Sequence, residues 1–279
     1  MKPPIGRDTR LCMSLSARPG NAGSRFHNRL YELLGLDYVY KSFSTTDLPA
    51  AIGGIRALDI RGCAISMPFK EAVIPLLDDL EASAQAIDSV NTIVNDGGRL
   101  TGYNTDYVAV RDLLGRRIDR PVPFLLRGSG GMAKAVAAAL RNAGFTEGRI
   151  IARNEAAGRA LAGQYGYDWQ AELPTDGAAL LVNVTPLGMA GKDEDALAFP
   201  PGHIASCEVA FDVVAQPVET PFIREARRQG KSIISGGEVI VLQALEQFVL
   251  YTGIRPGIAE IRAASDHAHG PEVAARIAG

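Results

Sequence analysis

Phe124-Leu125-Leu126 leads directly into Arg127-Gly128-Ser129-Gly130-Gly131-Met132-Ala133, and this order sets the architecture of the chain. A short apolar run, closely spaced glycines and then an alanine-rich segment are the pattern of a β-strand that feeds a phosphate-binding turn and a helix. A plain strand-to-helix connection is the alternative. Because a helix N-terminus attracts anions, the pattern predicts a dinucleotide-binding turn. Its candidate residues are Gly128, Ser129, Gly130, Gly131, Met132 and Ala133.

Apolar runs alternate with segments of helical periodicity on both sides of this turn, which is typical of an α/β protein with a mainly parallel sheet. Strands are expected at 38–43, 62–66, 90–94, 100–103, 124–126, 149–152, 179–184, 209–214 and 232–234. The strands at 90–94 and 100–103 are expected to form a hairpin around Asn95-Asp96-Gly97-Gly98, because Asp-Gly suits the positive φ of such turns. Helices are expected at 24–34, 47–58, 69–80, 107–114, 132–142, 155–164, 220–229 and 239–252. A first domain therefore runs to about residue 106, and a Rossmann-like domain follows it.

Composition favours a soluble enzyme with no membrane or nucleic-acid partner. The 279 residues are 47% hydrophobic, which is enough for two domain cores, and the net charge of −2 gives no reason to expect an anionic partner. No apolar run approaches the ~20 residues of a membrane span. Three distant cysteines argue against a disulfide framework or a zinc site and favour a reducing cytoplasm, and the four histidines lack metal-ligand spacing. We expect no metal.

Three further segments carry side chains suited to proton transfer. They are Ser66-Met67-Pro68-Phe69-Lys70-Glu71, Ser89-Val90-Asn91-Thr92 and Tyr103-Asn104-Thr105-Asp106. Taken singly, a lysine is most often solvated, an asparagine opens a turn and an aspartate caps a helix. Hydride addition to a ketone, however, leaves an oxygen that must receive a proton as it forms. A lysine, an amide and a carboxylate beside a dinucleotide turn therefore suggest a dehydrogenase.

These segments resemble the shikimate dehydrogenase family along nearly the whole chain. The family's Pro-Phe-Lys, Val-Asn-Thr and Asn-Thr-Asp elements stand at 68–70, 90–92 and 104–106, and its strand-end motif near the nicotinamide resembles 183–189. The resemblance implies an N-terminal substrate domain of residues 1–106, an NADP-binding domain of residues 107–238, and C-terminal helices within 239–279 that return to the first domain.

The resemblance also implies roles for individual residues. Lys70 would be the proton-transfer residue and Asp106 its partner, while Asn91 and Gln243 would bind ring hydroxyls of the substrate. Ser66 keeps a hydroxyl where the family has threonine, and Thr185 would lie near the nicotinamide.

Several positions depart from the family pattern. Asn21 and Gly23 stand where the family has two serines that hold the substrate carboxylate, and Ala215 stands where it has a tyrosine. Ala64 replaces an asparagine. Arg18, three residues before Asn21, is a candidate for the lost carboxylate contact, although a solvated loop arginine is an equal alternative. The pattern is similar to the divergent shikimate dehydrogenase-like branch, which includes shikimate/quinate dehydrogenases.

Cofactor choice depends on the end of the strand after the glycine turn, where an acid favours NAD and an arginine favours NADP. The chain has Ala152-Arg153-Asn154-Glu155 there, so Arg153 and Asn154 are candidate contacts to NADP. A surface arginine is the ordinary alternative. The family's second arginine falls on Ala157, with Arg159 close by, which leaves NAD open as a cofactor.

We therefore expect an NADP-dependent oxidoreductase that interconverts shikimate, or a close cyclic hydroxy acid, and its 3-keto form in aromatic amino acid biosynthesis. A quinate or aminoshikimate dehydrogenase with poor shikimate activity is one alternative. A non-catalytic nucleotide-binding regulatory protein is another. The resemblance implies a cytoplasmic enzyme and leaves a homodimer open.

Overall fold

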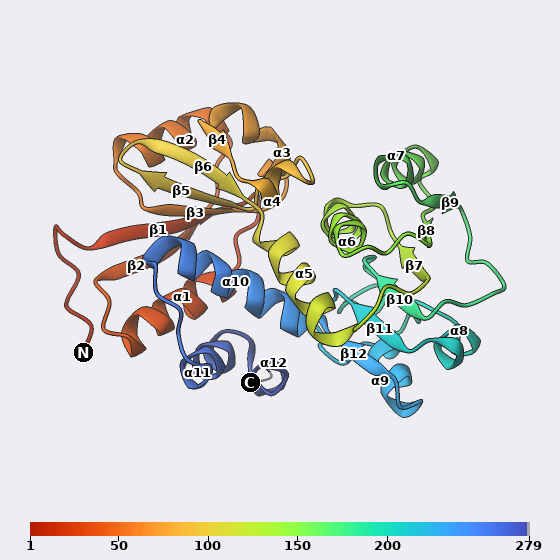
Figure 1. Cartoon of the computed structure of the whole chain (residues 1–279). Coiled ribbons are helices and arrows are strands. Elements are labelled where there is room, and N and C mark those ends of the chain that lie inside the picture. The colour runs from red at the N-terminus through yellow and green to blue at the C-terminus, as the bar shows by residue number, and fades with distance from the viewer. Residues whose placement is uncertain (278–279) are drawn as a thin grey trace. The chain divides into compact units, whose positions relative to one another are not determined.

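The computed structural model describes residues 1–277 and divides into two compact units (Figure 1). The first unit contains Met1–Thr105 and the chain from Val241 onward, and the second contains Asp106–Ile240. The chain passes between them inside two helices, α5 (Thr105–Arg117) and α10 (Gly236–Thr252). The first unit is thus built from both ends of the sequence.

The first unit has a mixed six-stranded sheet with the strand order β2-β1-β3-β5-β6-β4. Its strands are β1 (Arg10–Leu15), β2 (Tyr38–Phe43), β3 (Gly62–Ile65), β4 (Asp79–Leu80), β5 (Thr92–Asp96) and β6 (Arg99–Tyr103). Its other helices are α1 (Ala22–Leu33), α2 (Leu48–Ala57), α3 (Phe69–Ala72), α4 (Ala82–Gln85), α11 (Ile258–His269) and α12 (Pro271–Ala274), with a 3-10 turn, η1, at Ile74–Leu76. The expected hairpin is present, since β5 and β6 are antiparallel and Gly97 adopts φ 60° between them.

The second unit has a wholly parallel six-stranded sheet, ordered β9-β8-β7-β10-β11-β12. Its strands are β7 (Phe124–Arg127), β8 (Gly148–Ile151), β9 (Asp168–Gln170), β10 (Leu180–Asn183), β11 (Val209–Asp212) and β12 (Ser232–Ile234). Its helices are α6 (Gly131–Asn142), α7 (Glu155–Tyr165), α8 (Pro201–Ser206) and α9 (Pro221–Arg228). This is the strand order of a Rossmann fold, and the order reverses between β7 and β10. Open parallel sheets bind their ligands outside the carboxyl ends of the strands at such a point.

The single helix expected at 69–80 is wrong. Helix α3 ends at Ala72, η1 follows, and the chain is a strand by Asp79. Pro75 explains the break, because a proline in a helix interior lacks an N–H and clashes with the preceding turn. Helix α1 also begins earlier than expected, with Asn21 at its N-cap, while the Ser24 hydroxyl contacts Ser42 Oγ at 2.9 Å. The short elements α4, β9 and α8 were not anticipated.

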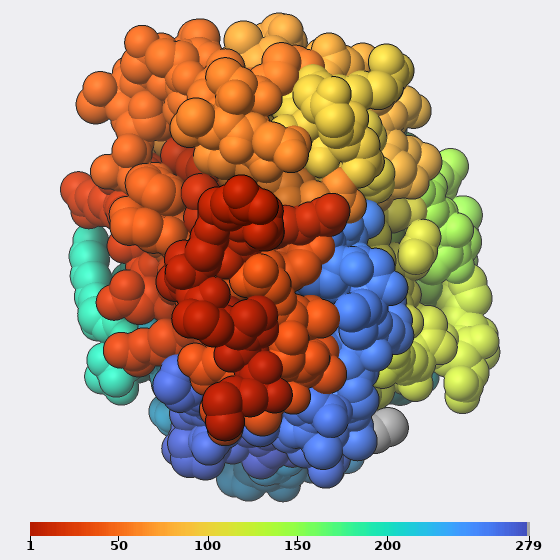
Figure 2. All heavy atoms as spheres, turned by 90° about the vertical axis from the view of Figure 1, so that its left-hand side faces the viewer, coloured from red at the N-terminus to blue at the C-terminus, as the bar shows by residue number. Residues whose placement is uncertain are grey.

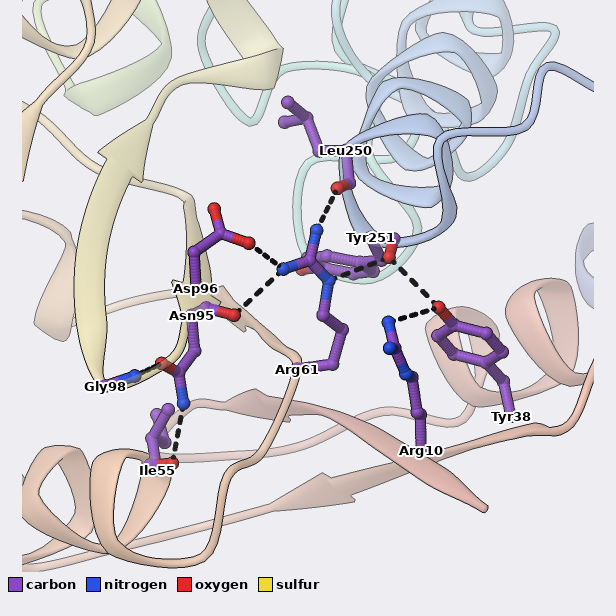
Figure 3. Close-up of polar contacts among 9 residues, drawn as sticks. All are labelled: Arg10, Tyr38, Ile55, Arg61, Asn95, Asp96, Gly98, Leu250 and Tyr251. Carbon is purple, nitrogen blue, oxygen red and sulfur yellow. Dashed lines mark hydrogen bonds and ion pairs between the residues drawn. The ribbon is translucent and has the colours of Figure 1, made fainter. Parts of the chain in front are cut away.

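The C-terminal half of α10 is tied to the first sheet by Arg61 (Figure 3). Its guanidinium donates to the carbonyls of Tyr251 at 2.9 Å and Leu250 at 3.3 Å, and to the carbonyl of Asn95 at 2.9 Å. The last carbonyls of a helix have no partner within the helix, so a cation there is stabilising. Gly62 permits the close approach, because a Cβ atom at this position would lie 2.2 Å from the Tyr251 ring.

Helix α11 packs against α1, so residues from both ends of the chain form one face of the first unit. Figure 2 shows the blue C-terminal residues adjoining the red N-terminal residues on this face.

Candidate functional site

Three loops of the first unit are joined by backbone hydrogen bonds near the end of β3. The Ser66 N–H donates to Leu15 O at 2.9 Å, and the Ala17 N–H donates to Met67 O at 3.1 Å. The Val90 N–H donates to Lys70 O at 2.9 Å. These bonds bring the segments that carry Arg18, Ser66, Lys70 and Asn91 side by side, although the four residues lie up to 73 positions apart in sequence (91 minus 18).

Asn91 lies at the centre of a buried polar network. Its side chain is only 2% exposed, and its Oδ1 accepts from the Thr105 N–H and from Thr92 Oγ1, each at 2.8 Å. Its Nδ2 donates to Thr105 Oγ1 at 3.0 Å. Because the amide is held on both sides, its orientation is fixed before any ligand arrives.

The same network fixes the start of α5. Thr105 is the first residue of this helix, and Asp106 is the next, so Asp106 lies in the first helical turn and not at the cap before Tyr107 that the alternative interpretation required. Asn104 is anchored as well, since its Nδ2 donates to Ser89 O at 2.9 Å. Asp106 is 8% exposed, so its carboxylate is buried at the start of α5.

Gln247 joins this network from α10, and the sequence did not single it out. Its Nε2 donates to Thr92 Oγ1 at 3.1 Å and to Asn91 O at 3.4 Å. Gln243, the expected substrate ligand, lies one helical turn earlier on α10 and is half-buried. Residues four apart share a helix face, and this spacing was the one available signal for Gln247.

The glycine turn of the second unit fits a dinucleotide pyrophosphate. Gly128 has φ 124°, and a Cβ atom there would lie 2.7 Å from Val184 Cγ2, so only glycine is accommodated. A Cβ atom at Gly130 or Gly131 would meet no atom within 4 Å, which leaves the turn open for close approach. No side chain caps the start of α6, so its first N–H groups can bind an anion.

Met132 lies in the first turn of this helix. The Ala133 side chain is completely buried and lets α6 pack closely on the sheet.

Two expected cofactor residues have structural partners. Asn154 caps α7, because its Oδ1 accepts from the Ala157 N–H at 3.1 Å. Thr185 Oγ1 donates to Asn183 Oδ1 at 2.6 Å. These bonds explain both residue types without a ligand, yet they also hold the loops after β8 and β10 in place.

Asn183 in turn donates to Asp212 at 3.0 Å. Asp212 also accepts from the Thr220 hydroxyl at 2.7 Å and the Val214 N–H at 3.0 Å. Burial nevertheless raises the pKa of Asp212 to about 6, because these donors compensate only part of the desolvation. This carboxyl holds the carboxyl ends of β10 and β11 together.

The arginines after β8 differ in their surroundings. Arg153 is exposed. Arg159 donates to Glu155 Oε1 at 2.8 Å and lies over the Trp169 ring, 4.3 Å from its centroid. Because its guanidinium is already engaged by Glu155 and Trp169, Arg159 is a poor substitute for the family arginine that is missing at Ala157.

The described part of the chain contains no helix that is long and apolar enough to cross a membrane. Within residues 1–277, no group of three or more histidine, cysteine, aspartate or glutamate side chains is arranged to hold a metal ion.

The family model described as the shikimate dehydrogenase substrate binding domain matches residues 22–93. A shikimate dehydrogenase-like protein of Haemophilus influenzae is 57% identical over 254 residues, which cover 90% of this chain and 94% of the relative. The shikimate dehydrogenase (NADP(+)) of Pelodictyon phaeoclathratiforme is 34% identical over 251 residues, with 85% and 89% covered.

Solved structures agree in fold. Shikimate 5-dehydrogenase from Thermus thermophilus, in complex with NADP(H) and shikimate, superposes with a TM-score of 0.81 at 31% identity, and the match covers 93% of this chain and 99% of that one. Quinate dehydrogenase from Corynebacterium glutamicum, in complex with NAD, gives a TM-score of 0.81 at 26% identity, with 92% and 98% covered. The expected two-part α/β architecture is confirmed.

Proposed function

Because this chain belongs to the shikimate dehydrogenase family, we propose that it is an NADP-linked oxidoreductase that interconverts shikimate, or a close cyclic hydroxy acid, and its 3-keto form. The observation that carries the proposal is the buried network around Asn91, which joins the segment of Lys70 to the start of the helix that carries Asp106.

In the proposed reaction, the Lys70 ammonium donates a proton to the carbonyl oxygen of the substrate as that oxygen becomes an alkoxide. In the opposite direction, Lys70 Nζ accepts the hydroxyl proton. The Asp106 carboxylate orients this amine and balances its charge. Asn91 and Gln243 bind ring hydroxyls, and the fixed orientation of the Asn91 amide lowers the entropy cost of alignment. Ser66 adds a hydroxyl beside them.

We assign the first unit to the substrate and the second unit to NADP. Gly128, Ser129, Gly130, Gly131, Met132 and Ala133 would hold the pyrophosphate, and Arg153 the 2′-phosphate. Asn154 and Thr185 would hold the adjoining loops. When bound, the nicotinamide supplies or accepts the hydride. The free, buried cysteines are compatible with a cytoplasmic enzyme.

A second candidate substrate, quinate or an amino-substituted analogue, is favoured by the altered carboxylate contacts. Asn21, Gly23 and Ala215 lack the hydroxyls that the family pattern has at these positions. A carboxylate without donors loses its hydration on binding and gains little in return, so shikimate affinity would be low unless Arg18 compensates.

Steady-state assays with shikimate, quinate and aminoshikimate test the proposal, with NADPH formation measured from NADP+ and NADH formation measured from NAD+. We expect substrate-dependent reduction of NADP+ with at least one of the three acids, and its loss in a Lys70→Ala control. Binding of NADP+ without turnover of any of these acids would support the non-catalytic alternative and overturn the proposal.

A further inference from the structure

Arg127 occupies an unusual place for an arginine. It ends β7, directly before Gly128, and its side chain is half-buried. Within residues 1–277, its guanidinium has no carboxylate partner and donates through Nη1 to the carbonyl of Ala198. A guanidinium has five N–H donors, and one carbonyl acceptor uses only one of them. The remaining donors and the positive charge are therefore available to a further acceptor.

Arg153 lies on the same side of the sheet. Strands β7 and β8 pair Arg127 with Ile151, and side chains two positions apart in extended chain share a face. The chain is still extended at Ala152, whose N–H donates to Gln170 O at 3.0 Å. Arg153 therefore emerges just beyond Arg127 at the carboxyl edge of the sheet. In the described part of the chain, Arg153 also has no ion pair.

The two guanidinium groups interact unfavourably. Burial, and secondly the charge of Arg153, lower the pKa of Arg127 below its ordinary value. Two other arginines of the same unit do have carboxylate partners: Arg149 pairs with Asp176 at 2.6 Å, and Arg159 pairs with Glu155 at 2.8 Å. Two like charges that lie close together repel each other. An anion bound between them would turn this repulsion into a net attraction, because it attracts both.

We propose that Arg127 and Arg153 together bind the 2′-phosphate of NADP, so that Arg127 supplies the second guanidinium that the chain lacks at position 157. This inference rests on the proposed function for its cofactor. A phosphate dianion accepts two guanidinium forks, whereas the ribose hydroxyl of NAD at the same place offers no charge. Arg127 comes from the strand before the glycine turn, on the opposite side of Gly128 from α6.

The test is ligand affinity measured without turnover. Isothermal titration with adenosine 2′,5′-bisphosphate and with adenosine 5′-monophosphate isolates the 2′-phosphate, and titration with NADPH and NADH repeats the comparison. Arg127→Met keeps the apolar stem and removes the charge. We expect affinity for the bisphosphate and for NADPH to fall about 10- to 100-fold, with the other two ligands changed less than about twofold.

Arg149→Met is the matched control, because it removes an arginine at the other end of the neighbouring strand, and it should change none of the four affinities. Arg127→Lys keeps the charge without the fork and should lose an intermediate amount of bisphosphate affinity. The double variant Arg127→Met/Arg153→Met should lose less than the product of the two single losses, because one phosphate is shared. The melting temperature of ligand-free Arg127→Met should not fall.

Equal affinities of Arg127→Met and the unaltered protein for the bisphosphate would overturn the inference. Equal loss for all four ligands would overturn it as well. The proposed function fails separately: a protein that turns over none of the cyclic acids and still distinguishes the bisphosphate through Arg127 retains this inference.

Discussion

The two units hold their polar groups in opposite ways. In the first unit, Asn91, Thr92, Thr105 and Gln247 are neutral and satisfy one another in a buried network. In the second unit, Arg127 and Arg153 are charged and have no carboxylate partner among residues 1–277, and the N-terminus of α6 has no side-chain cap.

The difference follows from the range of the forces involved. Hydrogen bonds to hydroxyl groups are short and directional, so neutral donors discriminate only when they are aligned in advance. Charges attract a phosphate over a longer distance and with less demand on angle. In our proposal, the first unit therefore recognises its ligand by geometry and the second unit by charge.

Loss of proton transfer should be the largest effect, and it should leave cofactor affinity untouched. In Lys70→Ala, kcat should fall about 100- to 10,000-fold, because the lysine acts mainly in the transition state. Rapid-mixing kinetics with the best substrate and NADPH titrations give the two quantities. Asp106→Asn should be similarly impaired, and the double variant should be little worse than either single variant. Turnover near that of the unaltered protein in Lys70→Ala would refute the assignment.

Loss of cationic recognition should appear in cofactor selectivity alone. Arg153→Ala should weaken NADP binding by about 1.5 to 3 kcal/mol and leave NAD binding nearly unchanged, since only NADP carries the 2′-phosphate. The dissociation constants of both cofactors measure this. Arg159→Ala is the control, because its guanidinium is engaged with Glu155 and Trp169. An equal loss of affinity for NADP and NAD would show that Arg153 attracts both cofactors and does not select the 2′-phosphate.

Buried titratable groups should give the two units opposite pH dependence. Burial lowers the pKa of His27 in the first unit to about 3. The unfolded chain then takes up a proton near pH 6.5 and the folded chain does not, so stability is lost as the pH falls below this value. Asp212 has the reverse sign, because its folded pKa of about 6 lies above the ordinary 3.8, and stability is lost as the pH rises between the two values.

Urea unfolding between pH 4 and pH 7.5 tests this contrast. Relative to His27→Phe, the unaltered protein should lose up to about 1.4 kcal/mol of stability for each pH unit below 6.5. Relative to Asp212→Asn, the unaltered protein should lose stability as the pH rises from about 4 to about 6. Differences that do not vary with pH would mean that neither group changes its protonation on folding.

The smallest effect concerns the carboxylate of the substrate. Arg18 is exposed in the loop that joins the Ser66 segment, so Arg18→Ala should raise the substrate KM about three- to tenfold with the cofactor KM unchanged. Arg25→Ala, which removes an exposed charge from α1 nearby, should leave both values unchanged. An unaltered substrate KM in Arg18→Ala would remove Arg18 from the site.

The sequence predicted those features that depend on local patterns. The glycine turn and the hairpin at Gly97 are encoded within a few residues, and both are present. The helix at 69–80 failed because Pro75 outweighs an apolar periodicity that otherwise continues past it. The two-residue strand β4 could not be foreseen, because it exists only through its pairing with β6.

Long-range contacts limit how much of the candidate site could be predicted from the sequence. Lys70, Asn91 and Asp106 were found through their motifs, and their roles remain predictions. Gln247 contacts Thr92 from 155 residues away, and only its spacing of four residues from Gln243 on the same helix could have indicated it. The sequence did not single out Arg127, which lies one residue beyond the strand expected at 124–126, because its place beside Arg153 depends on the register of β7 against β8.

The first unit's assembly from both ends of the sequence has a consequence for biosynthesis. Its sheet is complete at Tyr103, but the Tyr251 ring that covers Gly62 is made only after the whole second unit has been translated. At typical elongation rates this interval lasts on the order of ten seconds. The part of the protein that is synthesised first is therefore the last to be finished, because Tyr251 can cover Gly62 only after the second unit has been made.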